Sequence, residues 1–283
     1  MSDISGGFPP RLYLIGAQKA GTTSLAYLLG QHPDIVLSDP KEPGFFAANY
    51  DKGLAWYRRC FAAERAPVML DASTGYTMAS VGQGAGDDTV PKRIWACAPD
   101  ARFIYVLRDP VERTISAYRH DRRAGRLHGG LRDAVASHPF YADVSRYRRQ
   151  IEPFLAHFPL DRFLFVDFRE LSDDPVGVAR RCIAFAGLDP DAAALDLGAP
   201  KNAAFQFNGI GRMFFTLFPD ERAASRFVGF VKGMTPPAVH RLAKGAMTRA
   251  PDRIDEAERR WLAGLFEAEN RAMESLAGFR FYR

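Results

Sequence analysis

The sequence has few cysteines and no long apolar run. Its three cysteines, Cys60, Cys97 and Cys182, are scattered, which fits reduced thiols and excludes a disulfide framework. The six histidines are also dispersed, so we expect no metal site. No stretch approaches the ~20 apolar residues of a membrane span, and residues 1–10 lack the plan of a secretory signal. We therefore expect a cytoplasmic protein without a membrane span.

Charge of one sign is not in strong excess. The formal net charge is +5 at pH 7, which suits an anionic ligand but is too small to identify a partner. The sequence contains no nucleic-acid recognition module, so we expect no nucleic-acid partner. Composition carries no signal for the oligomeric state.

Short apolar runs alternate with amphipathic segments along the first two thirds of the chain. This alternation predicts an α/β fold with a parallel sheet flanked by helices. We expect strands at about residues 11–15, 35–37, 68–70, 103–107 and 163–166, and helices that include 22–30, 90–97, 143–158 and 255–276. The expected organisation is one domain over 1–283, with an α/β core at about 11–190 and a helical extension at about 205–283 packed on it.

The most informative segment is residues 12–25 (LYLIGAQKAGTTSL), an apolar strand followed by a glycine-bounded loop and hydroxyl residues. Free N–H groups at the start of a helix bind anions, and Gly16 and Gly21 allow the loop to bend closely around one. A Walker A loop carries its lysine directly after the second glycine. Here Lys19 precedes Gly21 by two residues, so the loop predicts a phosphate cradle of a different layout.

A second segment, residues 103–118 (FIYVLRDPVERTISAY), ends an apolar strand on Arg108 and continues into a helix. Ser116 follows Arg108 by eight residues. A guanidinium offers a planar fork of donors that matches a phosphate, and serine adds a hydroxyl. The alternative is that Arg108 only pairs with Asp109 or Glu112.

A third segment, residues 41–46 (KEPGFF), places Lys41 and Glu42 on a loop after the second strand. A positioned carboxylate can take the proton of an attacking hydroxyl, so Glu42 is our candidate general base, with His120 as an alternative. A solvated Lys–Glu pair is the plain interpretation. Residues 68–71 (VMLD) also look like a Walker B strand, which would hold Mg²⁺ through Asp71.

These segments carry a family resemblance. Residues 18–25 resemble the 5′-phosphosulfate loop of sulfotransferases that use 3′-phosphoadenosine-5′-phosphosulfate (PAPS), and residues 103–118 match the 3′-phosphate motif of those enzymes. Residues 41–46 resemble the Lys-Glu-Pro-His-Phe-Phe element of heparan sulfate sulfotransferases, with Gly44 in place of histidine. Ala72 stands where that family often has lysine, which argues against copying the heparan acceptor. The resemblance covers about residues 12–202 and implies a bacterial-type, single-domain sulfotransferase with a P-loop-like α/β fold.

The resemblance implies a function and a set of site residues. The sulfuryl group would move in line from PAPS to a hydroxyl or amine of a carbohydrate or small-molecule acceptor, with no metal. Glu42 would act as base, and Lys19 and Lys41 as electrostatic stabilisers. The residues implied to bind the nucleotide are Gln18, Lys19, Ala20, Gly21, Thr22, Thr23, Ser24, Arg108, Ser116 and Arg212. Two alternatives stay open, a Mg²⁺-dependent P-loop kinase or NTPase and a non-catalytic binder of anionic nucleotides.

Overall fold

The protein is described by a computed structural model. It describes residues 7–62, 68–78, 88–127, 129–197, 206–207, 248–249 and 253–281. Within these ranges the strands are β1 (Leu12–Gly16), β2 (Ile35–Leu37), β3 (Val68–Asp71), β4 (Arg102–Leu107), β5 (Phe163–Asp167), β6 (Gln206–Phe207) and β7 (Thr248–Arg249). The α-helices are α1 (Thr22–Leu29), α2 (Gly53–Arg58), α3 (Thr89–Cys97), α4 (Pro110–Arg123), α5 (Leu131–Ser137), α6 (Phe140–Asp143), α7 (Tyr147–Leu155), α8 (Phe168–Asp173), α9 (Pro175–Phe185) and α13 (Glu256–Ala277). Short 3-10 turns are η1 (Tyr50–Lys52), η2 (Thr74–Thr77) and η3 (Leu160–Arg162).

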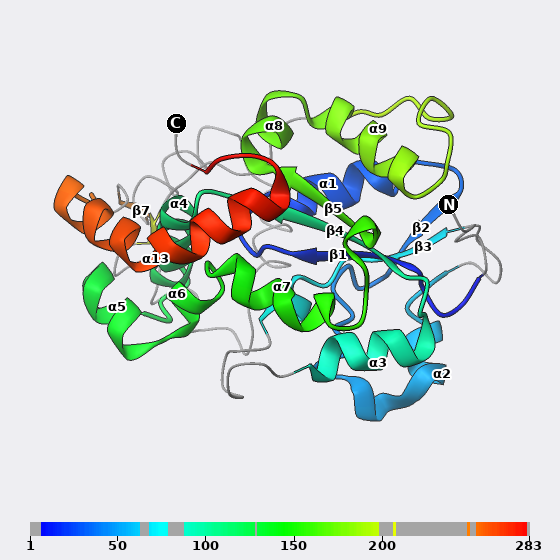
Figure 1. The fold of residues 1–283 in the computed structure, drawn as a ribbon, viewed down its shortest axis with the longest axis horizontal. Coiled ribbons are helices and arrows are strands. Elements are labelled where there is room, and N and C mark those ends of the chain that lie inside the picture. The colour runs from blue at the N-terminus through cyan, green and yellow to red at the C-terminus, as the bar shows by residue number, and fades with distance from the viewer. Residues whose placement is uncertain are drawn as a thin grey trace, which may run out of the picture.

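The main sheet is parallel, with the strand order β2-β3-β1-β4-β5 (Figure 1). Every residue of β1 and β4 is buried, which is why their sequences read as unbroken apolar runs. The chain passes from β1 to the edge strand β2, returns to β3 beside β1, and then crosses to β4 on the other side of β1. Ligands in such sheets bind at the carboxyl ends of the strands where this reversal occurs. The loops after β1 and β4 therefore meet at one place.

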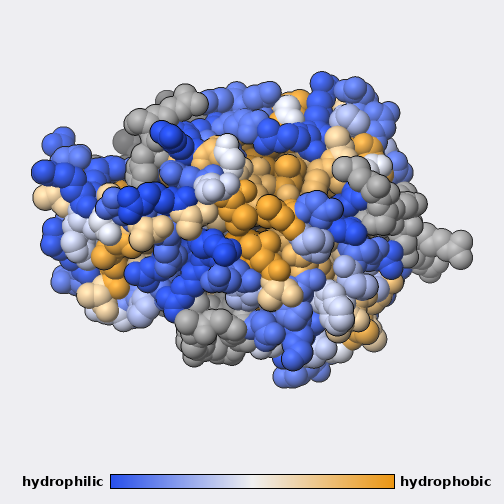
Figure 2. Space-filling model, viewed as in Figure 1, coloured by the Kyte–Doolittle hydropathy of each residue, from blue (hydrophilic) through white to orange (hydrophobic). Residues whose placement is uncertain are grey.

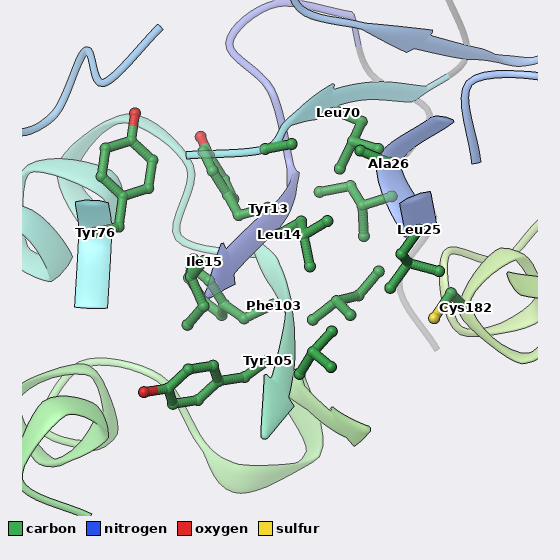
Figure 3. Packing of buried hydrophobic residues seen from close by; sticks show 14 of the residues in the cluster. Tyr13, Leu14, Ile15, Leu25, Ala26, Leu70, Tyr76, Phe103, Tyr105 and Cys182 are labelled. Atoms are coloured by element: carbon green, nitrogen blue, oxygen red, sulfur yellow. The ribbon is translucent and has the colours of Figure 1, made fainter. Parts of the chain in front are cut away.

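Helices cover both faces of the sheet. Figure 1 shows α1, α8 and α9 on one side and α3 and α7 on the other. Alternate side chains of β1 point to opposite faces, so Leu14 faces Leu25 and Cys182 while Tyr13 points toward the other side (Figure 3). The expected α/β core, with buried, unpaired Cys60 and Cys182, is confirmed.

Two expected helices differ from the structure. The helix expected over residues 143–158 is wrong at its start, because α6 ends at Asp143 and α7 begins only at Tyr147. Between them Ser145 turns inward, and its hydroxyl shares a 2.8 Å hydrogen bond with that of Thr114. The sequence also predicts a helix through Leu54, Trp56, Tyr57 and Phe61, and the corresponding helix α2 ends at Arg58.

The carboxyl-terminal helix α13 packs on α4 and α7. Leu262 and Phe266 lie on its buried face, so an amphipathic helix is confirmed there. Of the remaining expected extension, residues 208–247 and 250–252 lie outside the described residues. None of the helices that the structure describes is long and apolar enough to cross a bilayer.

Strand β5 forms an edge of the sheet as described and pairs with β4. Its residues Leu164 and Phe165 are only half-buried. In Figure 2, apolar residues gather in the middle of the face that is turned to the viewer. This is the part of the view that β5 and α7 occupy in Figure 1.

Candidate active site

The loop after β1 leads into the start of α1 without a side-chain cap. Gly21 is the N-cap residue and has a left-handed backbone with φ +79°. The first turn of α1 carries no acidic residue, and no side chain caps its N–H groups. Thr22 is buried, whereas Thr23 and Ser24 are exposed. The helix start thus offers uncompensated N–H donors and partial positive charge to an anion.

Close packing beneath this loop explains its first glycine. A Cβ atom at Gly16 would overlap the hydroxyl of Thr77 and lie 3.0 Å from the ring of Tyr105. Lys19, by contrast, holds a left-handed backbone with φ +70° although it has a side chain. Such a backbone costs about 1 kcal/mol or more outside glycine, so the fold holds this lysine at a conformational cost.

Arg108 lies directly against this loop. It follows β4, the neighbour of β1, and its Nη1 donates to the carbonyl oxygen of Lys19 at 3.0 Å. Its guanidinium carbon lies 4.6 Å from the centroid of the Phe168 ring, and the same ring lies beneath Gly21. The Nε atom of Arg108 is buried and has no hydrogen-bond partner among the residues that the structure describes. The two segments that the sequence singled out for two phosphates are therefore in direct contact.

Further cations from α4 surround Lys19. Burial lowers the pKa of Lys19, and the charge of Arg123 lowers it further. Burial, followed by the charge of Lys19, lowers the pKa of His120 in the same way. Because each pKa is lowered by burial and by a neighbouring positive charge, several cations share a partly dehydrated space. An anion bound there would relieve it.

Arg113 is the most unusual member of this group. It has no exposed surface, and its Nη2 donates to the carbonyl oxygen of Tyr141 at 3.1 Å. Its Nε and Nη1 have no hydrogen-bond partner within the described part of the chain. Burial lowers the pKa of Arg113 to about 10. A buried cation with spare donors is costly unless an anion completes its surroundings.

The structure describes three of the other residues expected to bind the nucleotide, but not Arg212. Gln18 is half-buried and Ala20 is fully buried in the loop. Ser116 is half-buried in α4, downstream of its N-cap residue Asp109. Arg212 lies outside the described residues.

Lys41 and Glu42 form a pair on the loop after β2. The Nζ of Lys41 lies 2.8 Å from Oε1 of Glu42, and the hydroxyl of Thr74 donates to Oε2 at 3.0 Å. The Glu42 side chain is 47% exposed, so a substrate can reach it. The carboxylate is thus oriented on one side by a cation and on the other by a hydroxyl.

Asp71, at the end of β3, is enclosed. It has no exposed surface, and its carboxylate accepts hydrogen bonds from the hydroxyl groups of Tyr57 at 2.6 Å, Ser73 at 2.6 Å and Tyr76 at 2.7 Å. A Walker B aspartate faces the Mg²⁺ site. Because hydroxyl donors occupy both oxygens of Asp71, the Walker B interpretation of residues 68–71 is not supported.

Burial of Asp71 predicts a pH-dependent stability. Burial raises its pKa to about 6 against the lowering effect of the three hydroxyl donors, and the nearby charge of Glu42 raises it slightly more. Because the folded-state pKa exceeds the unfolded one, the stability that this group contributes is present at low pH and is lost as pH rises through 6.

Relative to Asp71→Asn, we expect the free energy of unfolding of the wild type to fall by about 2 kcal/mol between pH 4 and pH 7.5. Urea denaturation of both proteins at both pH values measures this difference. If the free energy of unfolding of the wild type instead rises with pH relative to that of Asp71→Asn, the hydroxyl donors outweigh burial in setting the pKa of Asp71.

Several residues of the site were not identified from the sequence. Thr74 lies in the segment after the third strand and Arg123 in a run rich in arginine and histidine, and neither residue type points to a ligand there. Phe168 begins a segment for which the sequence indicates only a structural role. The clearest missed signal is Arg113, which lies on the same helix face as Pro110 and Ala117, where a charged residue needs a reason.

Comparison with known proteins gives consistent results. Residues 9–199 match the family profile described as "Sulfotransferase domain". The chain is 36% identical over 191 residues to heparan sulfate glucosamine 3-O-sulfotransferase 3A1 of Mus musculus, which covers 63% of this chain and 46% of that protein. It is 29% identical over 208 residues to bifunctional heparan sulfate N-deacetylase/N-sulfotransferase 2 of Homo sapiens, covering 64% of this chain and 22% of that protein. The chain thus spans less than half of the length of these two relatives.

Solved structures resemble the fold. A sulfotransferase from Alicyclobacillus acidocaldarius matches with a TM-score of 0.63 and 23% identity, over 95% of this chain and 96% of that one. A mouse sulfotransferase complexed with PAP matches with a TM-score of 0.55 and 14% identity, over 99% of this chain and 92% of that one.

Proposed function

This chain belongs to the sulfotransferase family, and from that premise we propose that it moves a sulfuryl group from PAPS to a hydroxyl or amine of a carbohydrate acceptor. The observation that carries the proposal is the 3.0 Å hydrogen bond from Arg108 to the carbonyl oxygen of Lys19. It joins two anion-binding elements at the ends of neighbouring strands, as a nucleotide with phosphates on both its 3′ and 5′ oxygens requires. The names of the relatives, which are heparan sulfate sulfotransferases, support a carbohydrate acceptor.

The residues present suit this nucleotide. The uncapped start of α1 can hold the 5′-phosphate through backbone N–H groups, from Gly21 to Ser24. Arg108, whose buried Nε has no hydrogen-bond partner among the described residues, and Ser116 can hold the 3′-phosphate. We place Gln18, Ala20 and Arg212 in the same nucleotide site on the resemblance alone. When bound, PAPS supplies the activated sulfuryl group.

The chain's own residues then have separate tasks. Glu42 takes the proton of the acceptor as its oxygen or nitrogen attacks sulfur. The ammonium of Lys19 stabilises negative charge that develops on the leaving phosphate, and the surrounding cations strengthen that field in a partly dehydrated site. Lys41 holds Glu42 in place and adds a second positive charge.

The test is a transfer assay with the purified chain. A heparan sulfate oligosaccharide is the first acceptor, and because Ala72 replaces a lysine of that family, other oligosaccharides are tested beside it. We expect PAPS and one of these carbohydrates to yield adenosine 3′,5′-bisphosphate and an acceptor heavier by one sulfuryl group, detected by mass spectrometry. Simple sugars, phenols and amines serve as comparison acceptors. Mg²⁺-dependent turnover of ATP would instead support a kinase or NTPase. Tight binding of adenosine 3′,5′-bisphosphate with no transfer to any acceptor would support a non-catalytic binder.

Replacement of Arg108 should separate the two phosphate sites. We expect Arg108→Ala to weaken binding of adenosine 3′,5′-bisphosphate by about 10- to 100-fold, since hydrogen bonds to charged groups contribute about 1.5–3 kcal/mol. Binding of adenosine 5′-monophosphate, which lacks the 3′-phosphate, should change far less. Isothermal titration calorimetry measures both, with the exposed, α9-located Arg180→Ala as control. Equal losses for the two nucleotides would contradict the assignment.

A further inference from the structure

The loop that carries Glu42 is attached to the segment after β3 through its backbone. The N–H of Gly44 donates to the hydroxyl oxygen of Ser73 at 2.9 Å, and the N–H of Phe46 donates to the hydroxyl oxygen of Tyr76 at 3.3 Å. These two amides lie two and four residues after Glu42 in the same loop. The position of the carboxylate therefore depends on two hydroxyl groups.

A hydroxyl oxygen accepts well only when its own proton points elsewhere. Ser73 and Tyr76 both direct their protons to Asp71, at 2.6 and 2.7 Å respectively. Asp71 thereby fixes the rotation of both hydroxyl groups, and their lone pairs face the amides of the loop. All three side chains are at most 1% exposed, so water does not compete for these positions.

Only a carboxylate can serve all of these donors. The hydroxyl group of Tyr57 also donates to Asp71, at 2.6 Å, so the two carboxyl oxygens accept three hydroxyl protons. An amide at this position has one acceptor oxygen and two N–H donors. It would leave at least one buried hydroxyl proton without an acceptor or turn a hydroxyl away from the loop.

We propose that Asp71 is a positioning residue, which holds the Glu42 loop in its reactive position by orienting the hydroxyl groups of Ser73 and Tyr76. The inference deepens the proposed function and rests on it, because it assigns the catalytic carboxylate to Glu42. Asp71 itself touches neither substrate nor nucleotide in this scheme. It acts through two hydroxyl groups on the backbone of residues 44–46.

Tyr57 provides a matched control. Its hydroxyl donates to the same oxygen of Asp71 as that of Tyr76, at nearly the same distance, and both tyrosines are fully buried. The hydroxyl of Tyr76 also accepts the N–H of Phe46, and no loop amide donates to that of Tyr57 in the described structure. Tyr57→Phe and Tyr76→Phe therefore remove the same hydrogen bond to Asp71, but only the second also removes the link to the loop.

We expect Ser73→Ala and Tyr76→Phe each to lower kcat by about 10- to 100-fold, since small misplacement of a reacting group has effects of this size. Tyr57→Phe should lower kcat by no more than roughly 3-fold, although its Tm should fall about as far as that of Tyr76→Phe. Affinity for adenosine 3′,5′-bisphosphate should stay unchanged in all three variants. Equal losses of kcat in Tyr57→Phe and Tyr76→Phe would overturn the proposal, because the loss would then follow from the shared hydrogen bond to Asp71 and not from the link to the loop.

Hydrogen exchange tests the same inference without any transfer assay. We expect the Gly44 amide to exchange faster in Ser73→Ala, the Phe46 amide faster in Tyr76→Phe, and both faster in Asp71→Asn, with neither altered in Tyr57→Phe. Unchanged exchange in the first three variants would refute the positioning role. If the wild type transfers no sulfuryl group, the proposed function fails, and the exchange result still decides whether Asp71 holds this loop.

Discussion

Replacing Lys19 by alanine should lower kcat for sulfuryl transfer by about 100- to 1000-fold, the loss seen when one preorganised group that stabilises transition-state charge is removed. The ammonium of Lys19 lies in a partly dehydrated site among other cations, where Arg108 holds its backbone and the charge of Arg123 acts on its amine. Its field is therefore little screened by water. The rate is measured at saturating PAPS and acceptor, so that weaker binding does not enter the comparison.

Two variants control this experiment. Lys52→Ala removes a lysine that rests on the Trp56 ring, 4.5 Å from the centroid and on an exposed turn, and should leave kcat unchanged. Lys19→Gly removes the same amine but also relieves the left-handed backbone at φ +70°. We expect it to be as inactive as Lys19→Ala and about 1 kcal/mol more stable. An alanine variant that keeps its activity would refute the role of the amine.

Replacing Glu42 by glutamine should lower kcat by about 100- to 10,000-fold, the range for general-base catalysis. Glutamine keeps the size of the side chain, and its oxygen can still accept the hydrogen bond from Thr74. It cannot take up a proton from the acceptor. Calorimetry should show unchanged affinity for adenosine 3′,5′-bisphosphate, because the nucleotide is held by the loops after β1 and β4.

The matched control is Glu152→Gln on α7. That glutamate is exposed and forms an ion pair with Arg148 at 3.1 Å, so the substitution removes a comparable surface pair away from the site. Its kcat should match that of the wild type. If Glu42→Gln keeps more than about a tenth of the wild-type kcat, Glu42 is not the base. His120, whose pKa is lowered by burial and by the charge of Lys19, would then be the next candidate.

Much of the fold was predictable because the central strands are buried on both sides. The apolar runs of β1 and β4 admit no other interpretation once helices follow each of them. The contact between Lys19 and Arg108 was predictable for a related reason, since both residues follow strands whose carboxyl ends share one edge of the sheet. Local sequence and simple topology were enough for these features.

Other features depend on tertiary contacts that no local pattern encodes. The break before Tyr147 arises because the Ser145 hydroxyl is satisfied by Thr114, which comes from a distant part of the chain. The enclosure of Asp71 likewise requires Tyr57, fourteen residues earlier, to fold back onto β3. From sequence alone, the same aspartate was compatible with a metal-binding Walker B strand, against which only the position of Lys19 argued.

The enclosed guanidinium of Arg113 carries a cost for folding. Its spare donors and its enclosed charge raise the free energy of the empty protein, and they do not do so in the unfolded chain, where water surrounds them. A ligand that binds only the native state adds about 2.7 kcal/mol of stability at a hundred times its dissociation constant. We expect the proposed nucleotide, as a ligand of the native state, to offset this cost, and a rise in Tm on addition of adenosine 3′,5′-bisphosphate would show it.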